Sequence, residues 1–333
     1  MWKDFQVNSD MQIIRLSGTM TNDKHIDDLK SLVEIVDDHY PGIDIWFKKK
    51  VVPGLKQTER TAFLIYYQGN PIGSAIIKKG KETKLCSMRI APGHQKKGIG
   101  SLLMSLIGKE IIDNACEIYF TAPESTYFKF KSFFDNWGFR CGGEVGIHYR
   151  NFEKEILCTI DTKTLWNNVI QNIGRLFERF SRDGKPIHPE IVLSIKPEYA
   201  DKIKKRKKIV EVRRKFNKKW EGASAMLYAS NPSQEFFGEA RISKVIEGSP
   251  TEIWKLFNSD LGVHESMFFQ YCQGVETVNA LVLSDVEIFV NGIQKNHIES
   301  LLNKSVIPPQ SYARIIQGTN WSTTALLNYL LLA

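Results

Sequence analysis

The sequence predicts an α+β protein of two domains: a first domain of strands and helices, followed by a small β-barrel-like domain with short helices. Three observations support this prediction. The chain has 333 residues, more than one ordinary domain holds. Short alternating apolar runs, typical of half-buried strands, occur in both halves, with helical periods between them. Eleven basic residues and one acid lie between Lys202 and Lys219, whereas the whole chain carries only +8, so the basicity is confined to one segment of the second half.

The first domain is predicted to span residues 1–160. Two apolar runs flank the turn residues Gln68-Gly69-Asn70, which predicts a β-hairpin over residues 61–79. Residues 85–90 alternate and predict a strand, and the apolar run that begins at Ser101 predicts a helix. Further strands are expected at residues 118–122, 147–152 and 155–160, and a helix is expected to end near Gly138.

A connecting segment is predicted over residues 161–186. Apolar residues at a helical period predict a helix from Leu165 to Phe180, and residues 181–186 combine glycine and proline, which indicates a stop and a linker. We interpret the helix as a strut between the domains, with a substrate lid as the alternative.

The second domain is predicted over residues 187–315, and residues 316–333 are predicted to form a helical tail that docks on the protein. Strands separated by short helices indicate a small β-barrel-like fold. The strands are expected at residues 188–195, 208–214, 225–229, 237–246 and 280–289, and the helices at residues 197–203, 250–257 and 265–273.

Composition indicates a cytoplasmic globular protein without membrane contact. No apolar run approaches the ~20 residues of a membrane span, and the first residues lack the apolar core of a signal peptide. Five cysteines, an odd number without close pairs, predict reduced thiols rather than a disulfide framework. The seven histidines are scattered, so we expect no metal site.

The segment Gln95-Lys96-Lys97-Gly98-Ile99-Gly100 lies between the strand at residues 85–90 and the helix that begins at Ser101. Glycines allow unusual backbone angles and close approach, and the first N–H groups of a helix have no intrahelical acceptor. This arrangement predicts an anion cradle that holds a diphosphate by backbone donors. A plain strand–helix turn is the alternative.

Together with Arg89-Ile90-Ala91-Pro92, this loop resembles the acyl-coenzyme A signature of the GNAT acetyltransferase family, over roughly residues 11–155. The resemblance implies a mixed, mostly antiparallel sheet flanked by helices. It also implies acetyl-CoA as the cofactor and direct attack of an amine on the thioester within a ternary complex. The strand would hold pantetheine and thioester, and the loop the pyrophosphate. The implied cofactor-binding residues are Cys86, Met88, Arg89, Ile90, Gln95, Lys96, Lys97, Gly98, Ile99, Gly100 and Ser101.

Proton-handling residues are less directly indicated. Many family members carry a tyrosine four residues before the glycine of the Gly-Phe helix end, and this chain has Phe134 there, which cannot protonate a thiolate. Tyr127, about two turns earlier on the same face, is the candidate acid, with core packing as its alternative. Glu124 is the candidate base, although an acid in a first helical turn often only complements the helix dipole. Glu82 and His94 are further candidates for the base.

The second domain resembles an ASCH domain, a PUA-like barrel, over roughly residues 187–315. The resemblance begins at Leu193-Ser194-Ile195-Lys196-Pro197, and the family motif Gly-x-Lys-x-x-Glu-or-Thr-x-Arg aligns with Arg206, Lys208, Glu211 and Arg213, with Arg206 in place of glycine. The resemblance and the basic segment imply RNA or nucleotide binding, and a solvated charged loop is the alternative. The implied residues are Lys196, Lys204, Lys205, Arg206, Lys208, Glu211, Arg213 and Arg214.

Some ASCH relatives hydrolyse acetylated cytidine with a lysine, a threonine and a glutamate. Lys208 fits the lysine and Glu239 loosely fits the glutamate, but Glu211 occupies the threonine position. A buried Lys208–Glu211 pair that shapes a pocket is the simpler interpretation.

Taken together, the sequence predicts an acetyl-CoA-dependent N-acetyltransferase whose second domain recruits RNA or a nucleotide-containing substrate. Because Phe134 replaces the expected tyrosine and no base is obvious, a non-catalytic RNA-binding regulator that senses acyl-CoA is the alternative.

Overall fold

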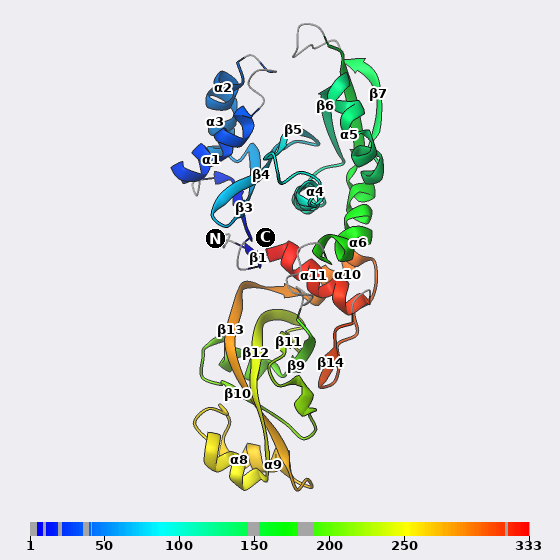
Figure 1. Cartoon of the computed structure of the whole chain (residues 1–333). Coiled ribbons are helices and arrows are strands. Elements are labelled where there is room, and N and C mark those ends of the chain that lie inside the picture. The colour runs from blue at the N-terminus through cyan, green and yellow to red at the C-terminus, as the bar shows by residue number, and fades with distance from the viewer. Residues whose placement is uncertain are drawn as a thin grey trace. The chain divides into compact units, whose positions relative to one another are not determined.

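The computed structural model describes residues 5–8, 11–18, 22–35, 40, 42–145, 153–178, 189–316 and 319–332 (Figure 1). The chain folds into two compact units, residues 1–187 with 329–333, and residues 188–328. Each unit is described by itself.

The first unit contains a mixed sheet in the strand order β1-β2-β3-β4-β5-β6-β8-β7. All neighbours are antiparallel except β5 and β6, which run parallel, so the predicted mixed, mostly antiparallel sheet is confirmed. The strands are β1 (Phe5–Asn8), β2 (Met11–Leu16), β3 (Arg60–Tyr67), β4 (Asn70–Lys78), β5 (Glu82–Ile90), β6 (Glu117–Pro123), β7 (Arg140–Val145) and β8 (Glu155–Asp161).

The predicted hairpin is the β3–β4 pair. Gln68 and Gly69 at its turn both have positive φ, 50° and 77°, as the tightest antiparallel connection requires. Almost every β3 side chain is buried, because helices cover both faces of this central strand.

Two groups of helices cover the sheet on opposite faces (Figure 1). Ile76 of β4 packs in the cluster that includes Leu29 and Phe47, whereas Gly73, three residues earlier and on the other face, lies against Ile99. The first group is α1 (Asp23–Glu34), α2 (Ile43–Trp46), η3 (Phe47–Val51) and α3 (Val52–Lys56), and the second is α4 (Ile99–Ile111), α5 (Glu124–Trp137) and α6 (Thr162–Glu178).

A buried ion-pair network attaches the end of α4 to the sheet. The Glu110 carboxylate accepts hydrogen bonds from Arg15 of β2, at 2.6 and 2.8 Å, and from Thr61 of β3, at 3.1 Å. Lys79 Nζ lies 3.1 Å from the same carboxylate. Burial raises the pKa of Glu110, but Arg15 and Lys79 more than offset this effect, so the pKa is held below its ordinary value.

The second unit is a curled sheet in the order β10-β13-β12-β11-β9-β14, antiparallel except for the β9–β11 pair. Repeated register shifts bend the long β12–β13 pair, as bulges do. At one shift a Cβ on Gly238 would lie 2.3 Å from the Glu287 carbonyl oxygen, so only glycine fits there. The strands are β9 (Ile191–Ile195), β10 (Val210–Arg213), β11 (Ser224–Ala229), β12 (Glu235–Gly248), β13 (Val278–Gln294) and β14 (Tyr312–Arg314).

The curled sheet encloses an apolar core on its inner face, including Leu193, Phe237 and Leu281, and its outer face packs against short helices. Asn328 near the C-terminus donates to Met226 Sδ at 3.1 Å, so the predicted tail helix packs on this unit. The helical elements are α7 (Pro197–Lys204), η4 (Lys218–Trp220), α8 (Pro250–Phe257), α9 (Glu265–Cys272), α10 (Lys295–Leu302) and α11 (Asn320–Leu332).

Several elements differ from the prediction. The glycine-rich segment after Gly138 forms β7, because it pairs with β8 in spite of its two glycines. Strands β2 and β14 and helix α10 had no clear periodic signal. The helix predicted from Leu165 begins at Thr162. The predicted strand at 147–152 and the linker at 181–186 lie outside the described residues. No helix among the described ranges is long and apolar enough to cross a membrane.

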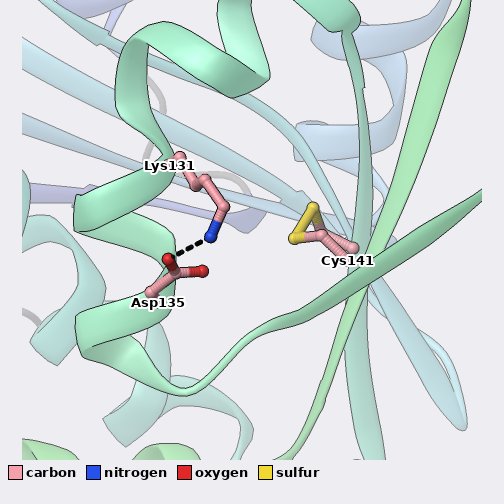
Figure 2. The surroundings of a disulfide bond; sticks show 4 residues. Lys131, Asp135 and Cys141 are labelled. Atoms are coloured by element: carbon pink, nitrogen blue, oxygen red, sulfur yellow. Dashed lines mark hydrogen bonds and ion pairs between the residues drawn. A yellow bond between two sulfur atoms is a disulfide. The ribbon is translucent and has the colours of Figure 1, made fainter.

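The prediction of five reduced thiols is wrong, because Cys141 and Cys158 form a disulfide (Figure 2). The two residues face each other on β7 and β8, with their Cα atoms 4.0 Å apart, although they are 17 residues apart in the chain. Strand pairing, which cysteine spacing does not reveal, brings them together. Cys86, Cys116 and Cys272 are free thiols. The cysteine-based argument for a reducing compartment therefore does not stand.

We expect Glu110→Gln to destabilise the first unit by about 3 kcal/mol near neutral pH, because it leaves Arg15 and Lys79 without their shared carboxylate. The pKa of Glu110 is lowered on folding, so its contribution is present above the ordinary value of 4.5 and is lost as pH falls through the lowered pKa. Urea unfolding of wild type and variant across this range measures the effect.

Asp44→Asn is the matched control, since this carboxylate also contacts two lysines, Lys30 at 3.2 Å and Lys48 at 3.0 Å, but at the surface. It should cost clearly less than Glu110→Gln, because exposed ion pairs contribute little to stability. Equal losses for the two variants would contradict the anchoring role of Glu110.

Candidate functional site

The parallel strands β5 and β6 part early. Their pairing runs only from Glu82–Glu117 to Lys84–Tyr119, although β5 continues to Ile90. No strand among the described residues lies beside residues 85–90 on the β6 side. Ala91 N–H donates to the Ile72 carbonyl, and alternation along the strand therefore directs the N–H groups of Met88 and Ile90 away from β4. Two backbone donors point to the open edge.

A loop leads from this edge into α4. Gly98 is the N-cap of α4 with φ 91° and ψ −6°, a left-handed conformation that favours glycine. No described side chain caps this helix, and its first turn carries no acid. The N–H groups of Ile99, Gly100 and Ser101 therefore lack an intrahelical acceptor, and the exposed Lys96 and Lys97 precede them. This geometry suits a bound anion.

Close packing holds the loop and helix start in place. A Cβ on Gly100 would lie 3.3 Å from Ile90 Cδ1 and 3.4 Å from the Phe133 ring of α5. A Cβ on Gly73 would lie 2.7 Å from Ile99 Cγ2. These glycines let α4 approach β4, β5 and α5 closely, so the predicted cradle residues also have a packing role.

The structure brings all eleven predicted cofactor residues into one continuous path, from the open part of β5 through the loop to the first turn of α4. Cys86 is the extra residue of a bulge opposite Ile76 and Ile77, and its Sγ accepts from Arg60 at 2.9 Å. The Arg89 guanidinium lies 5.9 Å from the Tyr40 ring and donates to the Met88 carbonyl.

Two buried hydroxyls beside this edge were not predicted. Ser74 and Ser87, 0% and 7% exposed, lie on β4 and β5, and neither Oγ has a hydrogen-bond partner in the described part of the chain. Ser74 is paired with Arg89 and Ser87 with Ile76, so both side chains lie on the face covered by α1–α3. Serine in a strand gives no sequence signal of this kind.

The candidate base and acid both lie on α5. Glu124 is the first residue of α5 and is exposed, and the Glu153 carboxylate, rather than that of Glu124, accepts from the Ser125 N–H at 2.6 Å. Tyr127, one turn later, is buried. Asp135, and after it Tyr127, raise the pKa of Lys131.

The other three residues considered for proton transfer, Phe134, Glu82 and His94, lie in different surroundings. Phe134 packs 4.7 Å from the Phe120 ring in an aromatic cluster, which fits an apolar role. Glu82 begins β5, eight residues before Ile90, and lies about 26 Å from that end of the strand. His94 is in the loop, with its ring 6.1 Å from Tyr67. Glu82 is therefore distant from the loop, at the opposite end of the strand.

In the second unit, Lys208, Glu211 and Arg213 form a buried charged cluster. Lys208 Nζ lies 3.2 Å from one Glu211 oxygen, and Arg213 Nη2 lies 3.1 Å from the other. Lys208 also donates to the carbonyls of Val210 and Leu261, both at 2.8 Å. Burial lowers the pKa of Lys208, against the opposing effect of Glu211. The predicted buried pair is present, and Arg213 extends it to a triad.

The motif position of Arg206 has φ 57°, in the left-handed region. This conformation gives a physical reason for glycine in the family motif. Arg206 adopts this conformation in the present chain, and its guanidinium donates a hydrogen bond to the Val286 carbonyl.

The eight predicted nucleotide-binding residues fall into two sets. Lys204 pairs with Glu235, and the Lys208–Glu211–Arg213 triad is buried, so these four residues are committed to internal contacts. The other four are exposed, namely Lys196, Lys205, Arg206 and Arg214.

A pocket of about 590 Å³ lies beyond the end of β10, and none of its lining residues is among the predicted site residues. Its volume is within the usual range for small-ligand sites. The Phe216 and Tyr312 rings lie 4.5 Å apart in its lining, and Asn279 is paired with Arg213 on one side and Glu247 on the other. The lining residues are Lys215, Phe216, Asn217, Lys218, Val245, Glu247, Asn279, Ser311 and Tyr312.

The residues weighed for hydrolysis come from different elements. Glu239 lies on β12, paired with Met226 on β11 and Glu287 on β13. Lys208 is held by two carbonyls and Glu211. Among the described residues, no group of three or more His, Cys, Asp or Glu side chains is placed to hold a metal ion.

Comparison with family models matches both units. Residues 28–139 match the acetyltransferase (GNAT) family, and residues 189–301 match a family described as a domain of unknown function, DUF365. A relative from Zymomonas mobilis subsp. mobilis, named an ASCH domain-containing ribonuclease, is 29% identical over 100 residues, which are 30% of this chain and 68% of the relative.

The chain is also similar to two solved structures. The crystal structure of ASCH from Zymomonas mobilis is 25% identical, with 42% of this chain and 94% of that chain covered and a TM-score of 0.37. An aminoglycoside 6′-N-acetyltransferase complexed with coenzyme A is 16% identical, with 45% of this chain and 97% of that chain covered and a TM-score of 0.36.

We expect Glu211→Gln to destabilise the second unit by about 3–5 kcal/mol, because Lys208 and Arg213 then remain buried without their counter-charge. The loss should diminish as pH rises toward about 10, since burial lowers the pKa of Lys208 and the unfolded chain then binds more protons than the folded one. Urea unfolding over this range measures it.

The double variant Lys208→Met/Glu211→Leu tests the same point without leaving a lone buried charge on that pair. It should be less destabilised than Glu211→Gln. A pH-independent loss in Glu211→Gln would contradict the role of the Lys208 charge.

Proposed function

We propose that this chain transfers an acetyl group from acetyl-CoA to an amine. It joins a GNAT acetyltransferase domain at residues 28–139 to an ASCH-like domain at residues 189–301. In this proposal the ASCH-like domain recruits RNA or a nucleotide-containing substrate.

The observation that carries the proposal is the continuity of the open β5 edge with the uncapped start of α4. The N–H groups of the first α4 turn, with Lys96 and Lys97 before them, suit the pyrophosphate. The N–H groups of Met88 and Ile90 suit the pantetheine and thioester. No acid in the first turn of α4 opposes an anion.

The chemistry requires alignment more than covalent help. When bound, acetyl-CoA supplies the acyl group as an activated thioester. The chain's own contribution is to position the thioester along β5, to direct backbone N–H groups at the carbonyl oxygen, and to remove one proton from the amine. Ser74 and Ser87 supply two further buried hydroxyls on the α1–α3 face of these strands.

Glu124 is our proposed base and Tyr127 our proposed acid, because they lie one turn apart on α5, which packs on the cradle through Phe133 and Gly100. Glu124 is exposed to the solvent from which an amine arrives. Tyr127 is buried, one turn along α5 from Glu124.

The ASCH-like domain supports recruitment through charge and shape. Lys196, Lys205, Arg206 and Arg214 are exposed and free of the buried triad, and the pocket offers aromatic rings beside polar side chains. The Zymomonas relative is named a ribonuclease, which fits an RNA-related ligand for this domain.

A regulator that binds acyl-CoA without catalysis is the second candidate. Phe134 in the aromatic cluster favours it, because this position supplies no acid. Release of free coenzyme A with tRNA, polyamines or peptides as acceptors separates the two candidates. Binding without release across the panel would favour the regulator.

We expect Ser101→Asp to weaken acetyl-CoA binding by about tenfold or more, because the carboxylate occupies the helix start and repels the pyrophosphate. The same carboxylate complements the helix dipole, so thermal stability should not fall. Isothermal titration calorimetry measures the affinity. The control Ser101→Ala keeps the backbone N–H and should bind nearly as wild type. Unchanged binding in Ser101→Asp would contradict the cradle.

Glu124→Gln should lower kcat/KM by about 10²–10⁴-fold and remove the basic-group limb of the pH–rate profile. Tyr127→Phe should lower the rate but keep the part of the pH–rate profile that is assigned to Glu124. Steady-state rates across pH measure both effects. An unchanged profile in Glu124→Gln would end its assignment as the base.

A further inference from the structure

Tyr271 is an exposed aromatic residue that the structure holds firmly. It lies on α9 with 41% of its surface exposed. Its hydroxyl donates to the Val212 carbonyl at 3.4 Å, and its own carbonyl accepts from Arg214 Nε at 2.7 Å. The Arg214 guanidinium lies over the ring, 5.3 Å from its centroid. Ring and guanidinium therefore form one fixed, solvent-facing platform, which we call the Tyr271–Arg214 platform.

The surroundings of this platform are apolar on one side and basic on the other. Met267, one turn earlier on the same face of α9, is 45% exposed. On the chain after Arg214, Lys215, Lys218 and Lys219 are all exposed. A planar ring beside mobile cations is the composition that binds unpaired bases and their phosphates.

The platform adjoins the pocket. Lys215 and Phe216, the first two lining residues, follow Arg214 directly in the chain. The Cα atoms of Arg214 and Phe216 are therefore at most about 7.6 Å apart, so the platform and the pocket lie close together.

We propose that the second domain binds single-stranded nucleic acid, with one base in the pocket beside Phe216 and Tyr312 and a neighbouring base stacked on the Tyr271–Arg214 platform. This inference rests on the proposed recruitment of nucleic acid, and it names the form of the ligand. Lys215, Lys218 and Lys219 contact the phosphates that join the two bases.

A duplex does not fit this arrangement. In a duplex, stacking between successive base pairs covers the faces of the bases, so the Tyr271 ring would have nothing to stack on and only phosphate contacts would remain. In the pocket, the Asn279 amide, the Ser311 hydroxyl and the Glu247 carboxylate present donors and acceptors to a base edge, which is occupied in a duplex.

The test uses the full chain and fluorescence anisotropy with a labelled, mixed-sequence oligoribonucleotide of about ten nucleotides, alone and annealed to its complement. Wild type should bind the single strand more tightly. Tyr271→Ala should weaken single-strand binding by about 5- to 100-fold and leave duplex binding unchanged. Tyr271→Phe, which keeps the ring, should bind nearly as wild type.

Two further variants keep the test independent of folding. Arg214→Lys keeps the charge but loses the planar group, and it should weaken the single strand alone. Ile307→Ala removes another exposed apolar side chain, 81% exposed, and should change nothing. Thermal unfolding confirms that each variant is folded.

The outcomes separate this inference from the proposal on which it rests. Equal affinity for both forms, together with no effect of Tyr271→Ala, would overturn the single-strand site while recruitment of nucleic acid stands. Absence of binding to either form would overturn both, and acetyl-CoA binding to the first domain would be untouched.

Discussion

The early parting of β5 from β6 is the constraint on which the first domain depends. A strand pairs on both sides only while both neighbours stay about 4.8 Å away. Strand β5 meets this condition with β4 along its length but with β6 only as far as Lys84. Beyond that point backbone polar groups face an open edge, and such groups need a polar partner. The same chain then enters the loop and the uncapped start of α4, so the backbone donors of the open edge and those of the helix start follow one another directly.

Packing elsewhere in this domain keeps that edge and helix in register. Glu110 attaches the far end of α4 to β2 and β3 through Arg15 and Thr61. At the near end, Gly73 and Gly100 remove the Cβ atoms that would push α4 away from β4 and α5. A displacement of either end would move the helix start relative to β5. The buried network and the two glycines therefore serve the geometry of the site, although none of these groups needs to touch a ligand.

The second domain separates its charges by burial. Glu211 pairs with both Lys208 and Arg213 inside the sheet, where a lone cation is costly, whereas the neighbouring basic residues remain in water. Charge density along the chain did not distinguish these two sets. The motif spacing did predict the Lys208–Glu211 pair, but the pocket escaped prediction because its lining comes from four separate segments.

The sequence by itself determined the local elements with a strong period or turn, such as the β3–β4 hairpin at Gln68-Gly69 and the loop ahead of α4. It also determined the two family resemblances, because a motif such as Gln95-x-x-Gly98-x-Gly100 is contiguous. Only the tertiary structure decided the open edge of β5, the Cys141–Cys158 disulfide, the buried Ser74 and Ser87 hydroxyls, and the placement of Tyr271 beside Arg214. These features depend on which strands and helices become neighbours, and neighbours distant in sequence are selected by burial of apolar surface over the whole domain rather than by any local pattern.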